Sequence, residues 1–194
     1  MHDLQITPTT SPTAVPSGRA ATRWMATFLG IPVAGYAGWL VSGHVDSLGA
    51  ALLGALITGV VLGAVQAWGL GRNRPPVAAW IAATTLGLMV GLGIGAAMVD
   101  YETSLSALVV QGAISGLAVG LAQAVVLLPR FGVVALAWAP ALAAIWATGW
   151  ATTTASGIDV DQQFVIFGAS GALVVTALTL VLPLALNRTA EAAA

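Results

Sequence analysis

Six apolar runs constrain this chain more than any other feature, because none of them contains a charged residue or a histidine. They cover residues 24–42, 48–70, 76–98, 104–128, 132–154 and 163–186. Each is close to the ~20 residues that an α-helix needs to cross ~30 Å of hydrocarbon at about 1.5 Å per residue. The segments between them are short, so neighbouring helices should run antiparallel. The sequence therefore predicts an all-α integral membrane protein with six transmembrane helices.

The composition agrees with this fold class. Hydrophobic residues make up 58% of the chain and charged residues 7%, too few to cover a soluble globule with polar surface. The six basic residues are all arginines and the net charge is -1, so the chain lacks the basic patch that nucleic-acid binding requires. Cysteine is absent, which excludes disulfides and a thiol nucleophile. We expect the lipid bilayer to be the first partner of the chain.

An internal repeat divides the six runs into pairs. The pattern Gly-x-x-x-Gly-x-x-Gln-Ala occurs at residues 59–67 and again at 116–124. A tryptophan opens each unit and an arginine closes it 50 residues later, in the pairs Trp24 and Arg74, Trp80 and Arg130, and Trp138 and Arg188. This spacing predicts three helical-hairpin repeats, 24–74, 80–130 and 138–188, in a pseudo-threefold arrangement. The third repeat has Leu178 and Thr179 roughly where the glutamine would be.

The charges predict the topology. Six spans place all six arginines on one side, which the positive-inside bias makes cytoplasmic, together with both termini. We expect residues 1–18, rich in proline, threonine and serine, to be a disordered cytoplasmic tail, residues 19–188 to be the membrane domain, and residues 189–194 to be a C-terminal tail. Tryptophans 24, 80 and 138 should lie at the cytoplasmic interface, as an aromatic belt.

Glycine stripes predict how the helices pack. Gly59 and Gly63, and likewise Gly116 and Gly120, share one helix face, where a missing side chain lets two backbones touch. We expect the helices that carry them, 48–70 and 104–128, to lie close together near the threefold axis.

Candidate site residues lie near the same stripes. Gln66 and Gln123 end the two glycine patterns, and Thr58 and Ser115 precede them on the same helices. The glutamines have two interpretations: a hydrogen-bonded tie between helices, or part of a polar site for a solute. The sequence leaves both open.

Acidic residues gather in the turns on the opposite side from the arginines. Carboxylates with His44 could bind a divalent cation. The alternative, which we favour, is that Asp46, Ser104 and Asp161 cap the helices that follow them. We therefore predict no metal site and no cofactor.

At the glycine, glutamine, arginine and tryptophan segments, 59–91 and 116–149, the chain resembles a loose group of bacterial polytopic membrane proteins of uncharacterised activity. The resemblance implies a multi-pass protein of the bacterial plasma (inner) membrane and no catalytic activity. Hydrolase, metalloprotease and phosphoryl-transfer signatures are missing, and no ionisable group lies in a span to drive proton-coupled transport. Two functions remain: a non-catalytic structural or accessory subunit that forms homo-oligomers or joins a membrane-protein partner through its glycine faces, and a passive channel or facilitator for a small neutral or lipophilic solute.

Overall fold

The computed structural model describes residues 17–162 and 164–192, and the regular elements in these ranges are all helical. In chain order they are α1 Ser17–Ala26, η1 Thr27–Leu29, α2 Gly30–Ser42, α3 Leu48–Leu70, η2 Gly71–Asn73, α4 Val77–Met98, α5 Leu105–Phe131, η3 Gly132–Ala137, α6 Trp138–Ala155, α7 Ala169–Leu178 and α8 Val181–Ala192. Residues 1–16 of the expected tail, and residues 193–194, lie outside the described residues. Residues 189–192, expected to belong to the C-terminal tail, continue α8.

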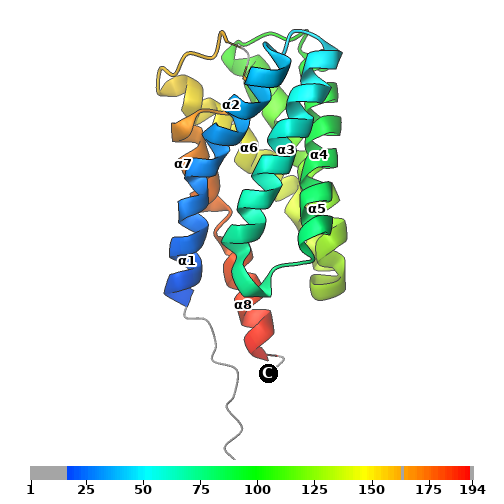
Figure 1. The fold of residues 1–194 in the computed structure, drawn as a ribbon, viewed down its shortest axis with the longest axis vertical. Helices are drawn as coiled ribbons and strands as arrows, with labels where there is room; N and C mark the ends of the chain where they lie inside the picture. The colour runs from blue at the N-terminus through cyan, green and yellow to red at the C-terminus, as the bar shows by residue number, and fades with distance from the viewer. Residues whose placement is uncertain (1–16, 163, 193–194) are drawn as a thin grey trace, which may run out of the picture.

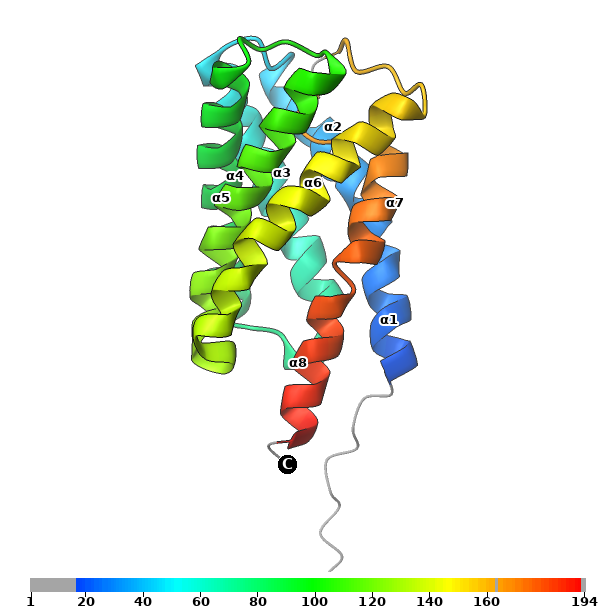
Figure 2. The ribbon, with the colours of Figure 1, turned by 180° about the vertical axis from the view of Figure 1, so that it is seen from behind.

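Five helical stretches are long and apolar enough to cross a membrane, which confirms an all-helical chain suited to several membrane passes. They are Gly18–Ser42, Leu48–Asn73, Val77–Met98, Leu105–Ala155 and Ala169–Ala192. The fourth has 51 residues and contains α5, η3 and α6. The chain reverses there at Gly132, whose φ of 58° favours glycine, and α6 packs back along α5 (Figure 2).

The helices form two layers, and the order of their contacts closes into a ring because α7 lies against the first helices of the chain. Figures 1 and 2 show α2, α3 and α4 on one side and α5, α6 and α7 on the other. From α2 to α7 each helix packs on its neighbours in sequence, and α7 also contacts α1, η1 and α2. Large apolar side chains such as Leu62, Leu88, Val119 and Trp146 fill the space between the layers.

The expected close pairing of α3 with α5 through their glycines is not what the structure shows, because the predicted packing glycines of α3 face α4 and those of α5 face α6. A Cβ added at Gly59 of α3 would lie 2.6 Å from the Cα of Thr85 on α4. On α4, a Cβ at Gly91 would lie 2.6 Å from the Cα of Ser115 on α5. Each interface between sequence neighbours thus has its own glycine stripe, and short connections bring these neighbours together first.

Three prolines explain where the helices break. Pro32, Pro140 and Pro183 are each the third residue of a helix, namely α2, α6 and α8. A proline ring clashes with the carbonyl four residues earlier and removes the N–H that would bond to it. Those earlier residues lie in η1, in η3 and at Thr179, between α7 and α8. The prediction of one continuous helix over 163–186 was therefore wrong.

The tryptophans also differ from expectation, because two of them are internal rather than at the lipid interface. Trp24 is 2% exposed and Trp80 is 1% exposed. The Nε1 of Trp24 donates to the main-chain oxygen of Thr176 at 2.9 Å. The helix break leaves that carbonyl without the N–H of Leu180, which bonds to Ala177 instead. The indole N–H thus takes the place of the backbone N–H that the broken helix no longer supplies to this carbonyl, which Thr179 Oγ1 also approaches at 3.2 Å.

Candidate functional site

The polar centre of the bundle is the amide of Gln123, on α5, which is 1% exposed. Its Nε2 donates to Gln66 Oε1 on α3 at 3.3 Å and to Thr84 Oγ1 on α4 at 3.0 Å. Its Oε1 accepts a hydrogen bond from Trp138 Nε1 on α6 at 2.8 Å. One side chain therefore joins four helices, and we call these four residues the amide junction.

Both amide N–H donors of Gln123 are engaged within the protein. An indole N–H can donate but not accept, so the atom that faces Trp138 must be the amide oxygen of Gln123. Thr84 donates its own hydroxyl hydrogen to the carbonyl of Trp80 at 2.9 Å, so it is the acceptor toward Gln123. The geometry suits a tie between helices better than a site for a solute.

The other two predicted residues lie elsewhere. Thr58 is fully buried and donates to the main-chain oxygen of Ala34, at the contact between α3 and α2. Ser115, 3% exposed, lies where α5 meets α4. Each precedes its glutamine by eight residues, about 12 Å along a helix. The structure brings Gln66 and Gln123 together and leaves Thr58 and Ser115 at two separate interfaces.

The four predicted packing glycines all face neighbouring helices of the same chain. An added Cβ at Gly63 would lie 2.9 Å from the Cα of Ile81 on α4, as at Gly59. On α5, Gly116 and Gly120 face α6, where a Cβ at Gly120 would lie 2.6 Å from the Cα of Ala139. These faces are occupied inside the bundle, so another molecule would need a different surface.

Two of the three tryptophans that open the sequence repeats donate a hydrogen bond to another repeat. If the repeats are taken in a ring, with the third preceding the first, each of these bonds goes to the preceding repeat. Trp138, of the third unit, bonds to Gln123 of the second. Trp24, of the first, donates at 3.2 Å to Thr179 Oγ1 of the third, where the sequence replaces the glutamine. Trp80 is in the corresponding place beside the first unit, but its Nε1 has no partner among the described residues. Trp138 was predicted to lie at the cytoplasmic interface rather than beside Gln123, and Thr84 was not among the predicted site residues; the fixed spacing of the tryptophans is a signal for Trp138 alone.

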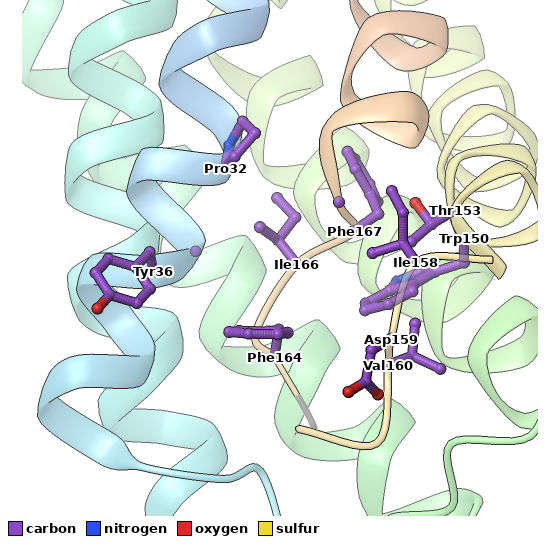
Figure 3. Close-up of a pocket in the computed structure, with 12 residues that line it drawn as sticks. Pro32, Tyr36, Trp150, Thr153, Ile158, Asp159, Val160, Phe164, Ile166 and Phe167 are labelled. Carbon is purple, nitrogen blue, oxygen red and sulfur yellow. The ribbon is translucent and has the colours of Figure 1, made fainter. Parts of the chain in front are cut away.

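A separate apolar pocket of about 220 Å³ opens at the end opposite the arginines (Figure 3). Tyr36 and Pro32 of α2 form one side and Trp150 of α6 another. Phe164 and Ile166, from the connection between α6 and α7, lie between them. None of the amide junction residues lines this pocket, so the polar centre and the pocket are distinct features.

The pocket forms where the chain enters α7 through a segment, residues 164–168, that is not helical. Phe167 is 1% exposed, and its ring meets Trp146 and Trp150 edge-on at 5.5 and 6.1 Å between centroids. A Cβ at Gly149 would lie 3.1 Å from this ring, so the missing side chain makes room for it. Residues 163–168 were predicted to be helical; residue 163 lies outside the described residues, and residues 164–168 are not helical. Gly168 directly before α7 is the signal that could have placed the helix start later.

The acidic turns are only partly explained by capping. Ser104 caps α5 as predicted, accepting from the N–H of Ala107 at 3.3 Å. Asp46 does not cap α3, because Ser47 does, accepting from Ala50. Asp161 lies too early to cap α7, which begins after Gly168. Within residues 17–162 and 164–192, no three acidic or histidine side chains gather closely enough to hold a metal ion.

At the arginine end of the bundle, Arg130 of α5 forms hydrogen bonds to α8 and to η2. Its Nε donates to Thr189 Oγ1 at 2.8 Å, Nη1 to the main-chain oxygen of Asn73 at 3.1 Å, and Nη2 to that of Leu186 at 2.8 Å. Arg23 instead stacks over Trp68, 5.0 Å from the ring centroid. These contacts use carbonyls, a hydroxyl and a ring, and no carboxylate.

Comparisons with known protein families, with curated proteins and with solved structures find no match to this chain. Its function therefore has to be argued from the geometry alone.

Proposed function

We propose that the chain crosses the bacterial inner membrane six times, as three hairpin repeats in a pseudo-threefold arrangement, with both termini cytoplasmic. The 51 residues of Leu105–Ala155 would span about 77 Å as one straight helix, more than twice the hydrocarbon thickness, and the reversal at Gly132 divides them into two passes. The bonds from Trp138 to Gln123 and from Trp24 to Thr179 support the repeat, because each relates one unit to the one before it.

The charge distribution supports the orientation. The arginines precede α2, follow α3, end α5 or lie in α8, all at one end of the bundle. The turns at the other end contain carboxylates and no arginine. The positive-inside bias then places the arginine end in the cytoplasm.

Within this membrane protein we propose a non-catalytic role as a structural or accessory subunit. The observation that carries the proposal is the amide of Gln123, whose two N–H groups and oxygen all have partners within the bundle. A passive facilitator would need free polar groups around a continuous cavity, whereas Gln123 is engaged and Thr58 and Ser115 lie buried at other interfaces. A closed, tightly packed bundle suits a protein that binds other membrane proteins through its outer surface.

The surface best suited to assembly is a lipid-facing groove between α3 and α4, because the glycine faces are already occupied. It measures about 590 Å³ and is apolar, with Leu48 and Leu52 on one side and Val90 and Ile94 on the other. Gly93 lies between these sides, and its position leaves 3.3 Å between an added Cβ and the leucine methyl groups. We expect an apolar helix of a second copy, or of another membrane protein, to bind here.

Cysteine cross-linking tests this proposal cleanly because the chain has no cysteine of its own. Val90→Cys, in the groove, should form a cross-linked species in native membranes, and native mass spectrometry from nanodiscs should give the mass of the same complex. Val125→Cys, on α5 and also exposed to lipid, is the matched control and should not cross-link.

Two results would count against the proposal. One is a monomer with no partner in both experiments. The other is a solute flux in proteoliposomes that Gln123→Leu abolishes, which would favour the facilitator.

A further inference from the structure

A second groove lies at the arginine end, between the end of α5 and the last two helices. It measures about 590 Å³, with Phe131 on one side and Leu178, Val181 and Ala185 on the other. The volume falls within the range of about 300–1,000 Å³ that is usual for ligand sites. We call it the α8 groove.

The α8 groove is a consequence of the helix break before Pro183. α7 packs on α6, but after the break at Thr179 and Leu180 the chain turns, and α8 contacts α1 and η2 instead. Figure 2 shows α8 diverging from the α5 and α6 pair. Leu178 and Val181 are left half-exposed, at 49% and 59%. In a bilayer such a lateral, apolar opening is in contact with lipid acyl chains.

Arg188 lines the α8 groove, and its guanidinium has no hydrogen-bond partner among the described residues. It is exposed and forms no hydrogen bond or ion pair with any described residue, including Glu191 one turn further along α8. Its neighbour Arg130 is different, since its guanidinium bonds to Thr189, Asn73 and Leu186. A guanidinium is suited to phosphate because it offers two parallel N–H donors.

The surrounding charge favours an anion. Six arginines lie at this end against one carboxylate among the described residues, that of Glu191, a local net charge of 6 − 1 = +5. An apolar groove that ends at a free guanidinium on a positive surface matches one molecule of the membrane itself, an acyl chain joined to a phosphate.

We propose that the α8 groove binds one anionic phospholipid, with an acyl chain along Val181 and Ala185 and its phosphate on Arg188. The net positive surface favours a lipid of net negative charge, such as phosphatidylglycerol, over the zwitterionic phosphatidylethanolamine. This site lies away from the α3 and α4 groove, so the lipid site and the assembly surface can each fail without the other.

The test is native mass spectrometry of the full chain released from nanodiscs of equal parts phosphatidylglycerol and phosphatidylethanolamine. The unaltered protein should retain one phosphatidylglycerol in preference. Arg188→Gln should lower the ratio of retained phosphatidylglycerol to phosphatidylethanolamine about fivefold, which corresponds to the ~1 kcal/mol that one arginine contributes near an anionic surface. Arg188→Lys keeps the charge and should keep most of the preference.

Two further variants distinguish binding in the α8 groove from a general attraction of anionic lipid to the positive surface. Arg19→Gln removes the same charge from an exposed position at the start of α1 and should leave the ratio unchanged. Ala185→Trp fills the groove and should remove the bound lipid although Arg188 is intact, while the far-ultraviolet circular dichroism of the variant, which the added indole barely changes, shows that it remains helical. The proposal is overturned by equal losses from Arg19→Gln and Arg188→Gln, by a retained lipid in Ala185→Trp, or by displacement of the lipid by millimolar inorganic phosphate, which would assign the site to a free anion.

Discussion

Replacing Gly59 by alanine tests the view that close backbone contact holds this bundle together. The new Cβ would lie 2.6 Å from the Cα of Thr85 and 3.2 Å from its Cβ. Carbon atoms pack best at about 3.5–4.0 Å, so α3 and α4 would have to separate by roughly 1 Å. Overpacking of this kind costs about 1–3 kcal/mol.

The matched control is Gly49→Ala on the same helix, where an added Cβ meets nothing within 4 Å. Both changes gain helix propensity, up to ~1 kcal/mol each, so this contribution largely cancels between the two variants. The difference in unfolding free energy between them should therefore be close to the packing cost, about 1–3 kcal/mol, with Gly59→Ala the less stable.

The assay is unfolding of the purified protein by sodium dodecyl sulfate in mixed micelles, followed by tryptophan fluorescence. Several of the seven tryptophans are buried, so the signal reports on tertiary packing. Equal stability of the two variants would refute the reasoning, because it would mean that the helices separate at no cost.

Three other predictions concern the amide junction, the hydrogen bonds of Arg130 and the topology. Gln123→Leu removes three hydrogen bonds and should lower the free energy of unfolding by about 2 kcal/mol in the same assay. Gln66→Leu removes one hydrogen bond and should lower it by ~0.6 kcal/mol. Equal losses would contradict a junction centred on Gln123. Arg130→Gln removes the bonds to Thr189 and Leu186, so amide hydrogen exchange should quicken in α8 and stay unchanged in α4; unchanged exchange in α8 would show that these bonds are not needed. In cells, an impermeant maleimide should label Glu102→Cys without permeabilisation and Arg74→Cys only after it, and labelling of the second from outside would reverse the proposed orientation.

The long helices could be predicted from the sequence because one physical rule decides them. A run of about 20 residues without charge must satisfy its backbone internally in a bilayer, and a helix does so within a single segment. The predicted range 48–70 has the same limits as α3, and 76–98 differs by one residue from α4. The charged turns mark these ends, since arginines and carboxylates stay out of hydrocarbon.

The structure of the last apolar run could not be predicted from hydropathy, because an irregular segment and a broken helix can be as apolar as one continuous helix. Pro183 was the available signal, and its ring accounts for the break at Thr179. Residues 164–168 are not helical for a different reason. Gly149 has no side chain, and this leaves space beside α6 for the ring of Phe167. Such a fit depends on a residue distant in sequence and is visible only in the assembled structure.

The candidate site was predictable in part. The shared spacing of Gln66 and Gln123 pointed to two residues that the structure joins directly. The third and fourth members, Thr84 and Trp138, come from helices whose rotation the sequence does not specify. The helix pairing was mistaken because glycine stripes show that a face packs closely without showing which neighbour it meets.

The order of the helix contacts bears on how the protein is made. Most interfaces join consecutive helices, so each new helix can pack on the one before it as the chain leaves the ribosome, with little loop entropy to overcome. The bond from Trp24 to Thr176 is different, because it joins residues 152 positions apart. The indole of Trp24 therefore has no access to this partner until almost the entire chain has been synthesised. A ribosome stalled before α7 would leave an open bundle, with the indole of Trp24 exposed where α7 should cover it.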